Sequence, residues 1–219
     1  INWMATVDLV ALDFLEEATP LSHRMLLERY CVLMIYNTMD GPNWFDQLNF
    51  LSPDVSTCLW QNRQTGLDFV GISCSLDGIV AEIIFPDNGL SGSFPEDIYH
   101  LSSTKIFAFE NSTISGTLST AIGNMGELFG LYTGPSLLSG TIPSEVGLLK
   151  ELNYFYVNDC MMYGTIPTEM GTLPLLQELV VKGNQLTGPI PSELGQLPDI
   201  IALILYDNEL TGTVPTEMV

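Results

Sequence analysis

The chain has 219 residues, 46% of them hydrophobic, which is enough for one domain or two small ones with a buried core. Its 26 acidic residues outnumber 6 basic ones, and the resulting formal net charge of −20 is spread along the whole chain. Such a field repels phosphate backbones and anionic lipid heads, so nucleic acid and direct membrane-surface contact by this segment are disfavoured.

The segment 1–79 is expected to form an N-terminal cap of helices and loops. Apolar residues recur with helical spacing in two stretches up to residue 37, separated by Thr19 and Pro20. We expect the second helix to start at Ser22 and to stop in the turn from Asn37 to Pro42. The segment 43–78 then predicts loops, with two tryptophans and two cysteines in short order.

No stretch of the chain approaches the roughly 18 consecutive apolar residues that a membrane helix needs. The chain opens at Ile1 rather than at methionine, from which we expect that it has been processed or trimmed. A signal or a membrane anchor in the removed part is compatible with this expectation.

From Val80 onward, one short signature recurs six times at every 24th position, with glycines at 92, 116, 140, 164, 188 and 212. A fixed period of this size indicates a solenoid, because no unit can bury its apolar face alone. Apolar residues stand 12, 9 and 7 positions before each glycine, and this alternation predicts one short strand per repeat. The apolar residues after each glycine predict a short helical return. The expected fold is therefore a curved α/β solenoid over residues 80–219, with a parallel sheet on one side and an incomplete last unit.

One position in each repeat carries a small side chain that can form hydrogen bonds, four positions before the glycine. The chain turns off the strand there, and its backbone polar groups must be satisfied inside the stack. We call these residues the spine: Asn88, Ser112, Ser136, Cys160, Asn184 and Asn208. Cys160 is accordingly predicted to be a structural spine residue rather than a reactive thiol.

These repeats resemble the plant-type leucine-rich repeat family, whose units read L-x-x-L-x-L-x-x-N-x-L-x-G-x-I-P, over residues 80–219. The segment Asp40-Gly-Pro-Asn-Trp44, with Cys58-Leu-Trp60 and the Val70-Gly-Ile-Ser-Cys74 run, is similar to the cap of that family. The resemblance implies a right-handed leucine-rich repeat ribbon, with its sheet on the concave side, as in receptor-like ectodomains and secreted proteins. Thr104, Thr133 and Ser119 depart from the pattern, so repeats two and three are expected to be looser.

The resemblance also implies a disulfide between Cys58 and Cys74. A disulfide that closes a loop of about 15 residues stabilises the folded state by ~3 kcal/mol. Such a bond would stabilise a loop-rich cap that covers the first repeat. A disulfide implies an oxidising compartment, so the chain is expected to be secreted, luminal or membrane-anchored through another segment. Cys31, within an apolar helix, is expected to be a small buried hydrophobe.

A single N-glycosylation acceptor sequence begins at Asn111. We expect Asn111 to lie on the strand face, where a glycan would block binding beside it. The acceptor is consistent with an extracytoplasmic protein, although its occupancy stays open.

The sequence contains no recognisable catalytic or metal-binding constellation. Neither His23 nor His100 belongs to a set with a nucleophile, and phosphate-binding loops and zinc spacings do not occur. We therefore expect no enzymatic activity, no cofactor and no metal.

Two regular columns of polar residues each have an ordinary structural explanation and one alternative. Five units carry an acid five positions after the glycine, which favours short helix starts, with calcium binding between repeats as the alternative. These acids are Asp97, Glu145, Glu169, Glu193 and Glu217. Four units carry threonine directly after the glycine, which suits a second strand, with ice binding as the alternative.

Apolar and aromatic residues occupy strand positions that should face solvent: Ile84, Phe129, Tyr132, Tyr154, Tyr156, Ile201, Ile204 and Tyr206. Tyrosine and phenylalanine are enriched at interfaces because they bury much area at low entropic cost. Acids surround them as a rim: Glu82, Asp87, Glu110, Asp159, Glu178 and Asp207. The pattern predicts an interaction surface, and cross-strand packing that only stabilises the sheet is the alternative.

The leading hypothesis is a non-catalytic recognition domain that binds a protein or peptide on its concave face. Its predicted contact residues are Ile84, Phe129, Tyr132, Tyr154, Tyr156, Ile204 and Tyr206. The alternative is a structural subunit of a larger extracellular or luminal assembly, because Val219 falls inside the sixth unit and leaves an apolar edge for a neighbouring subunit or further repeats. Inhibition of a secreted hydrolase and ice binding are further alternatives.

Overall fold

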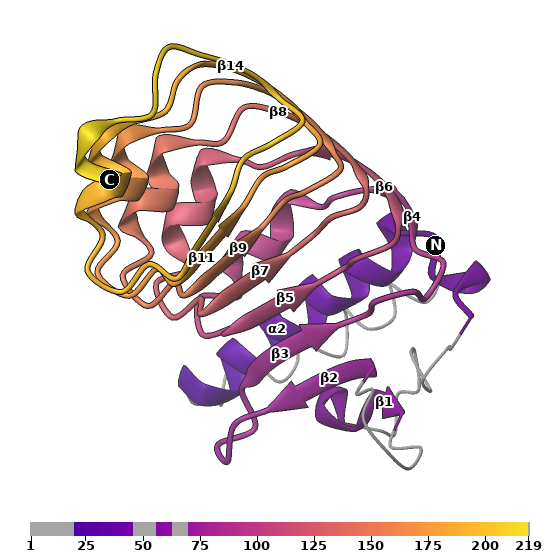
Figure 1. Ribbon diagram of the computed structural model, residues 1–219. Helices are drawn as coiled ribbons and strands as arrows, with labels where there is room; N and C mark the ends of the chain where they lie inside the picture. Colours follow the sequence, from indigo (N-terminus) through magenta and orange to yellow (C-terminus); the bar gives the residue numbers. More distant parts are fainter. Residues whose placement is uncertain (1–19, 46–55, 63–69, 219) are drawn as a thin grey trace.

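The computed structural model describes residues 20–45, 56–62 and 70–218. The first predicted helix and Val219 lie outside these residues. Within them, the chain winds into successive stacked coils, with strands on one side of each coil and short helices on the other (Figure 1). The predicted leucine-rich repeat solenoid is confirmed.

The cap is built on helix α2, which spans Pro20–Thr38. It begins slightly before the predicted Ser22, since proline lacks an N–H and is well accommodated in a first helical turn. The short 3-10 helices η1 (Gly41–Asn43) and η2 (Thr57–Leu59) follow it. None of the helices in the described ranges combines the length and hydropathy of a membrane span.

A sheet of eight strands in the described residues forms one side of the solenoid, in the order β1-β2-β3-β5-β7-β9-β11-β13. The cap supplies β1 (Gln61–Asn62) and β2 (Val70–Cys74), which pair antiparallel with each other, and β2 also pairs antiparallel with β3. From β3 onward all pairs are parallel, one strand per repeat. The repeat strands are β3 (Val80–Ile84), β5 (Ile106–Ala108), β7 (Gly130–Tyr132), β9 (Tyr154–Tyr156), β11 (Glu178–Val180) and β13 (Ala202–Ile204).

A second parallel sheet of six strands in the described chain contains five of the six repeated glycines, and Gly212 directly follows its last strand. Its members are β4 (Ser91–Ser93), β6 (Thr113–Thr117), β8 (Leu137–Gly140), β10 (Met161–Gly164), β12 (Gln185–Pro189) and β14 (Glu209–Thr211). Threonine after the glycine thus has the predicted role in or beside a second strand. We call this the lateral sheet.

The return of each coil is a 3-10 helix, and these helices stack on one another. They are η3 (Glu96–His100), η4 (Thr120–Asn124), η5 (Ser144–Leu148), η6 (Thr168–Thr172), η7 (Ser192–Gln196) and η8 (Thr216–Met218). The column of acids lies in their first turns. Successive helices approach closely, because a Cβ added at Gly147 would lie 2.7 Å from Glu169 Cβ.

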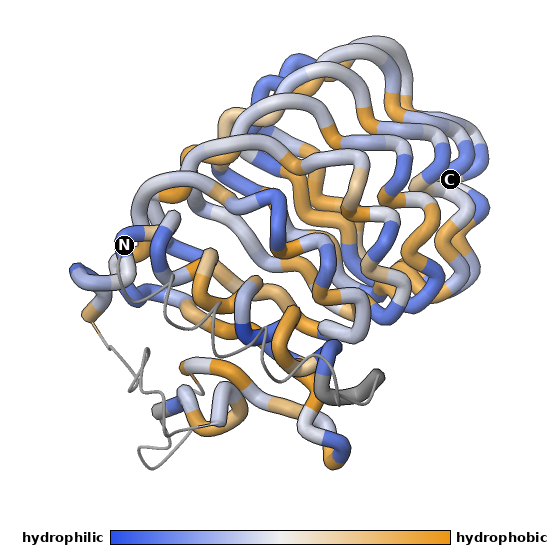
Figure 2. Tube along the Cα trace, turned by 180° about the vertical axis from the view of Figure 1, so that it is seen from behind, coloured by the Kyte–Doolittle hydropathy of each residue, from blue (hydrophilic) through white to orange (hydrophobic). Residues whose placement is uncertain are grey.

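The core is a continuous apolar column through the centre of the coils, visible as the inner orange band in Figure 2. The middle residue of each repeat strand points into it, and Phe107, Leu131, Phe155 and Leu179 are almost fully buried. Thr133 occupies a core position as predicted, but its hydroxyl has no hydrogen-bond partner among the described residues. This unpaired group is a local departure from a well-satisfied core.

The spine asparagines satisfy the backbone of two coils at once. Asn184 accepts a hydrogen bond from the Met162 amide at 2.9 Å and donates to the carbonyls of Val157 and Val181 at 2.7 and 3.0 Å. Cys160 is buried in the same column, with its Sγ 3.2 Å from Ser136 Oγ, and burial is the main cause that raises its thiol pKa. A protonated thiol is a poor nucleophile, in agreement with a structural role.

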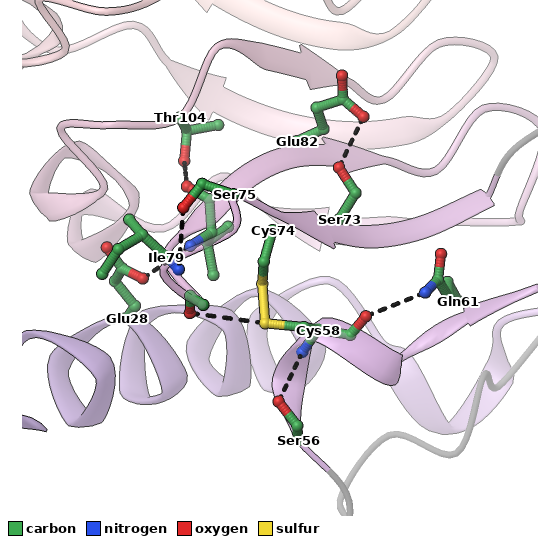
Figure 3. Close-up of a disulfide and its surroundings, with 12 residues drawn as sticks. Glu28, Ser56, Cys58, Gln61, Ser73, Cys74, Ser75, Ile79, Glu82 and Thr104 are labelled. Atoms are coloured by element: carbon green, nitrogen blue, oxygen red, sulfur yellow. Dashed lines mark hydrogen bonds between the residues drawn. A yellow bond between two sulfur atoms is a disulfide. The ribbon is translucent and has the colours of Figure 1, made fainter.

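A buried carboxylate fastens the cap to the first repeat, and a disulfide joins two elements within the cap (Figure 3). Glu28, on α2, accepts a hydrogen bond from the Val80 amide at 2.8 Å and pairs with Arg24 at 3.0 Å. Cys58 and Cys74 are bonded, which joins η2 to the end of β2. The disulfide therefore holds η2 to β2, the cap strand that pairs with β3 of the first repeat.

Replacement of Asn184 by alanine is expected to lower the free energy of unfolding by about 2 to 4 kcal/mol, because the buried Met162 amide and Val157 carbonyl lose their partner and the Val181 carbonyl keeps only Asn208. Denaturant unfolding measures the change. Asn158, whose amide bonds only the exposed Asp159 side chain at 2.8 Å among the described residues, is the matched control, and Asn158→Ala should cost less than about 1 kcal/mol. Equal effects of the two variants would contradict the assignment of the spine.

Replacement of Cys58 and Cys74 together by serine is expected to lower the free energy of unfolding by about 3 kcal/mol, since the bond closes a sequence separation of 16 residues. The wild-type protein unfolded in the presence of a thiol reductant is the control and should match the variant. A variant as stable as the oxidised protein would show that the cap does not depend on the bond.

Candidate functional site

The outward residues of the repeat strands form a continuous row across the concave sheet. Strand register brings Ile84, Ala108, Tyr132, Tyr156, Val180 and Ile204 side by side, one from each of six repeats. We call this the apolar row. Four of the residues predicted from the sequence, Ile84, Tyr132, Tyr156 and Ile204, therefore stand in one line, and two smaller, buried residues, Ala108 and Val180, complete it.

Four aromatic rings meet at the middle of this face, and we call them the aromatic cluster. Tyr132 lies 5.1 Å from Tyr156 and 6.3 Å from Tyr154, measured between ring centroids. Tyr154 also contacts Phe129 at 5.3 Å. The Tyr132–Tyr156 and Phe129–Tyr154 pairs are edge-to-face and the Tyr132–Tyr154 pair is stacked. Aromatic pairs in such arrangements are stabilised by about 0.5–1.5 kcal/mol, so the rings hold one another in place.

Hydrogen bonds to the next strand anchor two of the phenols. Tyr154 donates to Gln177 Oε1 at 3.0 Å, and Tyr156 donates to Glu178 Oε2. Phe129 keeps 38% of its surface exposed, and the three tyrosines are partly exposed. Cross-strand packing thus fixes the cluster without covering it.

Gly130 makes room for the aromatic cluster. A Cβ added to this glycine would lie 2.6 Å from the Tyr132 ring, so the ring folds over a position that has no side chain. Any larger residue at position 130 would displace the Tyr132 ring. In the sequence, this role of Gly130 shows only as a glycine at a strand position where the neighbouring repeats carry Ile106 and Tyr154.

Burial and neighbouring charges keep the phenols of this site protonated. Burial raises the pKa of Tyr132 above the usual range, and Tyr156, Tyr154, Glu110 and Glu178 act in the same direction. Burial and then the hydrogen bond to Glu178 raise the pKa of Tyr156 to about 12. Both phenols therefore carry their proton at neutral pH, and that of Tyr156 is donated to Glu178.

The acidic rim lies beside the cluster. Glu110 is half-buried, and burial followed by the charge of Asp87 raises its pKa. Ser73 Oγ donates to Glu82 at 2.7 Å near the cap. Of the predicted rim, Glu110 and Glu178 lie near enough to the cluster for their charges to act on Tyr132 and Tyr156.

Tyr206 stands apart from the cluster, in the last repeat. Its ring lies 5.6 Å from Lys182 Nζ, which pairs with Asp159 at 3.3 Å. The hydrogen bond to Asp159 is the largest cause that raises the pKa of Lys182. Here a carboxylate, a cation and an aromatic ring form one group.

Asn111 does not lie on a strand, contrary to the expectation from the sequence. β5 ends at Ala108, and Asn111 is exposed in the following turn with a left-handed φ of 54°. Asparagine and aspartate tolerate this conformation, which also occurs at Asp87 and Asp159 in equivalent turns. A glycan on Asn111 would project from the edge of the concave sheet rather than from its centre.

The lateral sheet exposes a different surface, which the sequence analysis did not single out. Leu137, Met161 and Tyr163 are 45%, 41% and 53% exposed there. Strand residues of β4 to β12 on this sheet carry no charge. Tyr163 is thus an exposed tyrosine away from the concave face.

Other side-chain chemistry is sparse. Among the described residues, no group of three or more histidine, cysteine or acidic side chains is gathered as a metal site. The glutamates in the first turns of η5 to η8 accept instead from the preceding hydroxyl, as Glu169 does from Thr168 at 3.3 Å.

Comparison with known proteins identifies the repeat. The family model described as Leucine Rich Repeat matches residues 175–197. The search among curated protein sequences finds no match.

Solved structures match over most of the chain. The PEPR1–AtPEP1 complex has a TM-score of 0.76 at 26% identity, covering 87% of this chain and 26% of that one. The plant peptide hormone receptor RGFR1 in complex with RGF2 has a TM-score of 0.61 at 34% identity, covering 63% and 22%. The BIR3–SERK2 complex from Arabidopsis thaliana has a TM-score of 0.69 at 25% identity, covering 84% and 95%. The chain thus spans about a quarter of the first of these proteins.

Glu178→Gln is expected to lower the pKa of Tyr156 from about 12, without restoring the ordinary value of 10.0, because burial remains the larger cause. Tyr156 contributes stability that is present below pH 10.0 and is lost as the pH rises to about 12, because only the folded state retains the proton in that window. NMR titration of the ring carbon bonded to the phenol oxygen measures the pKa. Glu193→Gln, in η7, is the control, and an unchanged Tyr156 pKa in Glu178→Gln would contradict the described hydrogen bond.

Proposed function

We propose that this chain, a leucine-rich repeat domain that matches plant receptor ectodomains, is a non-catalytic recognition module that binds an extended peptide or partner segment on its concave sheet. The observation that carries the proposal is the apolar row with the aromatic cluster at its middle. Leucine-rich repeat ectodomains are typically non-catalytic, in agreement with this role.

The dimensions of the apolar row suit an extended chain. Six parallel strands spaced by ~4.8 Å give a row of about 24 Å from Ile84 to Ile204, which is the length of roughly seven extended residues. A peptide lying along this row would cross the strands and contact each repeat in turn. The partly exposed tyrosines supply large, ordered contact surfaces with a polar tip.

Charge restricts the class of partner. The net charge of −20 and the rim of Asp87, Glu110 and Glu178 repel acidic segments. We infer a peptide or protein segment without net negative charge. Complementary charge would also speed its association.

The relatives support recognition as a class of function. RGFR1 is a peptide hormone receptor in complex with RGF2, and BIR3 is in complex with SERK2. Because the chain covers only 26% of PEPR1 and 22% of RGFR1, the activities of those whole proteins are proposals here. The disulfide and the likeness to receptor ectodomains support an extracytoplasmic location, secreted or membrane-anchored.

The test is a selection of displayed random peptides on the immobilised wild-type chain, followed by measurement of each selected synthetic peptide. Tyr132→Ser combined with Tyr156→Ser is expected to weaken binding by about 100-fold or more, the range of two interface hot spots. Tyr163→Ser, on the lateral sheet, should leave the affinity unchanged. Selected peptides that bind the double variant as tightly as the wild type would contradict the proposal.

Because the rings also stabilise one another, thermal unfolding of the double variant accompanies the binding assay. Phe129→Ala, at the exposed edge of the cluster, provides a milder variant that should weaken binding several-fold. Light scattering on the isolated chain separates recognition from the alternative of a structural subunit. A stable monomer disfavours that alternative, and a defined oligomer supports it.

A further inference from the structure

We propose that Tyr132, Tyr156 and Glu110 form a subsite for one cationic side chain of the bound segment, best matched by the guanidinium group of arginine. This inference rests on the proposed recognition function and specifies its chemistry. Three features support it. Glu110 and Glu178 flank the tyrosine pair, and neither forms an ion pair within the described residues. Elsewhere on the same face, Asp159, Lys182 and Tyr206 already combine a carboxylate, a cation and an aromatic ring.

The carboxylates flank the tyrosine pair along the axis of the solenoid. Glu110, Tyr132, Tyr156 and Glu178 belong to four consecutive repeats, so the two rings lie between the two acids. Both acids are close enough to act electrostatically on both phenols. A group placed over the Tyr132–Tyr156 pair is therefore exposed to negative potential from both directions.

The negative charge at this place is not compensated within the described part of the chain. The two ion pairs there are Arg24–Glu28 in the cap and Lys182–Asp159 near the last repeat. Glu110 is half-buried beside the like charge of Asp87, an arrangement that costs free energy in the unbound protein. A bound cation would offset both the burial of Glu110 and its repulsion from Asp87.

The same face already contains one completed group of this type. Lys182 Nζ lies 3.3 Å from Asp159 Oδ2 and 5.6 Å from the Tyr206 ring. At the middle of the face, no described lysine or arginine forms an ion pair with Glu110 or a cation–π contact with Tyr132 or Tyr156, and Lys105, whose backbone carbonyl accepts from the Phe129 and Gly130 amides, makes neither contact. The comparison indicates that the missing cation comes from the ligand.

The chemistry of the rings favours a cation over a neutral group. The face of a phenol ring carries negative potential, and cations within about 6 Å of its centre are attracted by about 0.5–2 kcal/mol. The Tyr156 hydroxyl donates a hydrogen bond to Glu178, which increases the electron density of that ring. A guanidinium group is planar, stacks on such rings and pairs with a carboxylate at the same time.

The first experiment titrates the wild-type chain with N-acetyl-arginine amide and, as a neutral molecule of the same shape, N-acetyl-citrulline amide. NMR signals of the Tyr132 and Tyr156 rings are followed. We expect saturable shifts with the arginine compound and binding about tenfold weaker with the citrulline compound. Equal binding of the two compounds, or shifts at Tyr163 instead of Tyr132 and Tyr156, would overturn the subsite.

Two variants separate a direct contact from a general effect of negative charge. Glu110→Gln should weaken the binding of the arginine compound about tenfold and leave the affinity for the citrulline compound unchanged. Glu193→Gln removes the same charge on the far side of the coil and should change neither affinity. Equal losses in the two variants would indicate general attraction to an acidic protein and would overturn the subsite.

The second experiment exchanges each arginine or lysine of the concave-face peptides for citrulline or norleucine. One such exchange should weaken binding about tenfold in the wild type and have no effect in Glu110→Gln. Peptides that depend on Tyr132 and Tyr156 but carry no basic residue would overturn the subsite and leave the recognition function standing. If no peptide binds the concave face but the arginine compound still binds there, the recognition function is overturned and the subsite is not.

Discussion

Each coil of this protein contains one short strand, one lateral strand and one turn of 3-10 helix, and none of these can bury its apolar side chains alone. Burial comes from the coil before and the coil after, so residues such as Phe155 and Leu179 are sealed only by stacking. This requirement explains the constant interval between the repeated glycines, since an insertion in the strand would move a core residue out of the column. It also explains the cap, because the first coil has no predecessor.

The same stacking arranges the concave face. When the middle residue of each strand points inward, its two neighbours must point outward, at a position repeated in every coil. Tyr132 and Tyr156 are therefore adjacent in space although one full repeat separates them in the chain. A change of side chain at one such position alters the surface without altering the core, which is how a regular scaffold can carry a specific site.

Sequence periodicity predicted the repeats, the core positions and the role of Cys160, because each is fixed by distance from the glycine. It also placed the tyrosines on the concave face. It did not predict the buried Glu28, whose partner is the Val80 amide far along the chain, nor the contribution of Gly130, which acts by lacking a side chain. Ala108 and Val180 were overlooked because the row that they complete depends on strand register, not on their own size. Asn111 was misplaced because the strand before it, β5, is only three residues long, and the turn begins earlier than the pattern suggests.

The composition of the spine has a consequence for how the coils are joined. Asn184 and Asn208 tie the last coils together with several hydrogen bonds each, whereas the middle coils rely on Ser112, Ser136 and Cys160, which make fewer and longer contacts among the described residues. The aromatic cluster lies over this middle part, in β7 and β9 and just before β7. The two kinds of cross-coil contact are thus divided along the length of the molecule: the last coils carry most of the spine hydrogen bonds, and the coils that carry the tyrosines are joined in addition by contacts between aromatic rings.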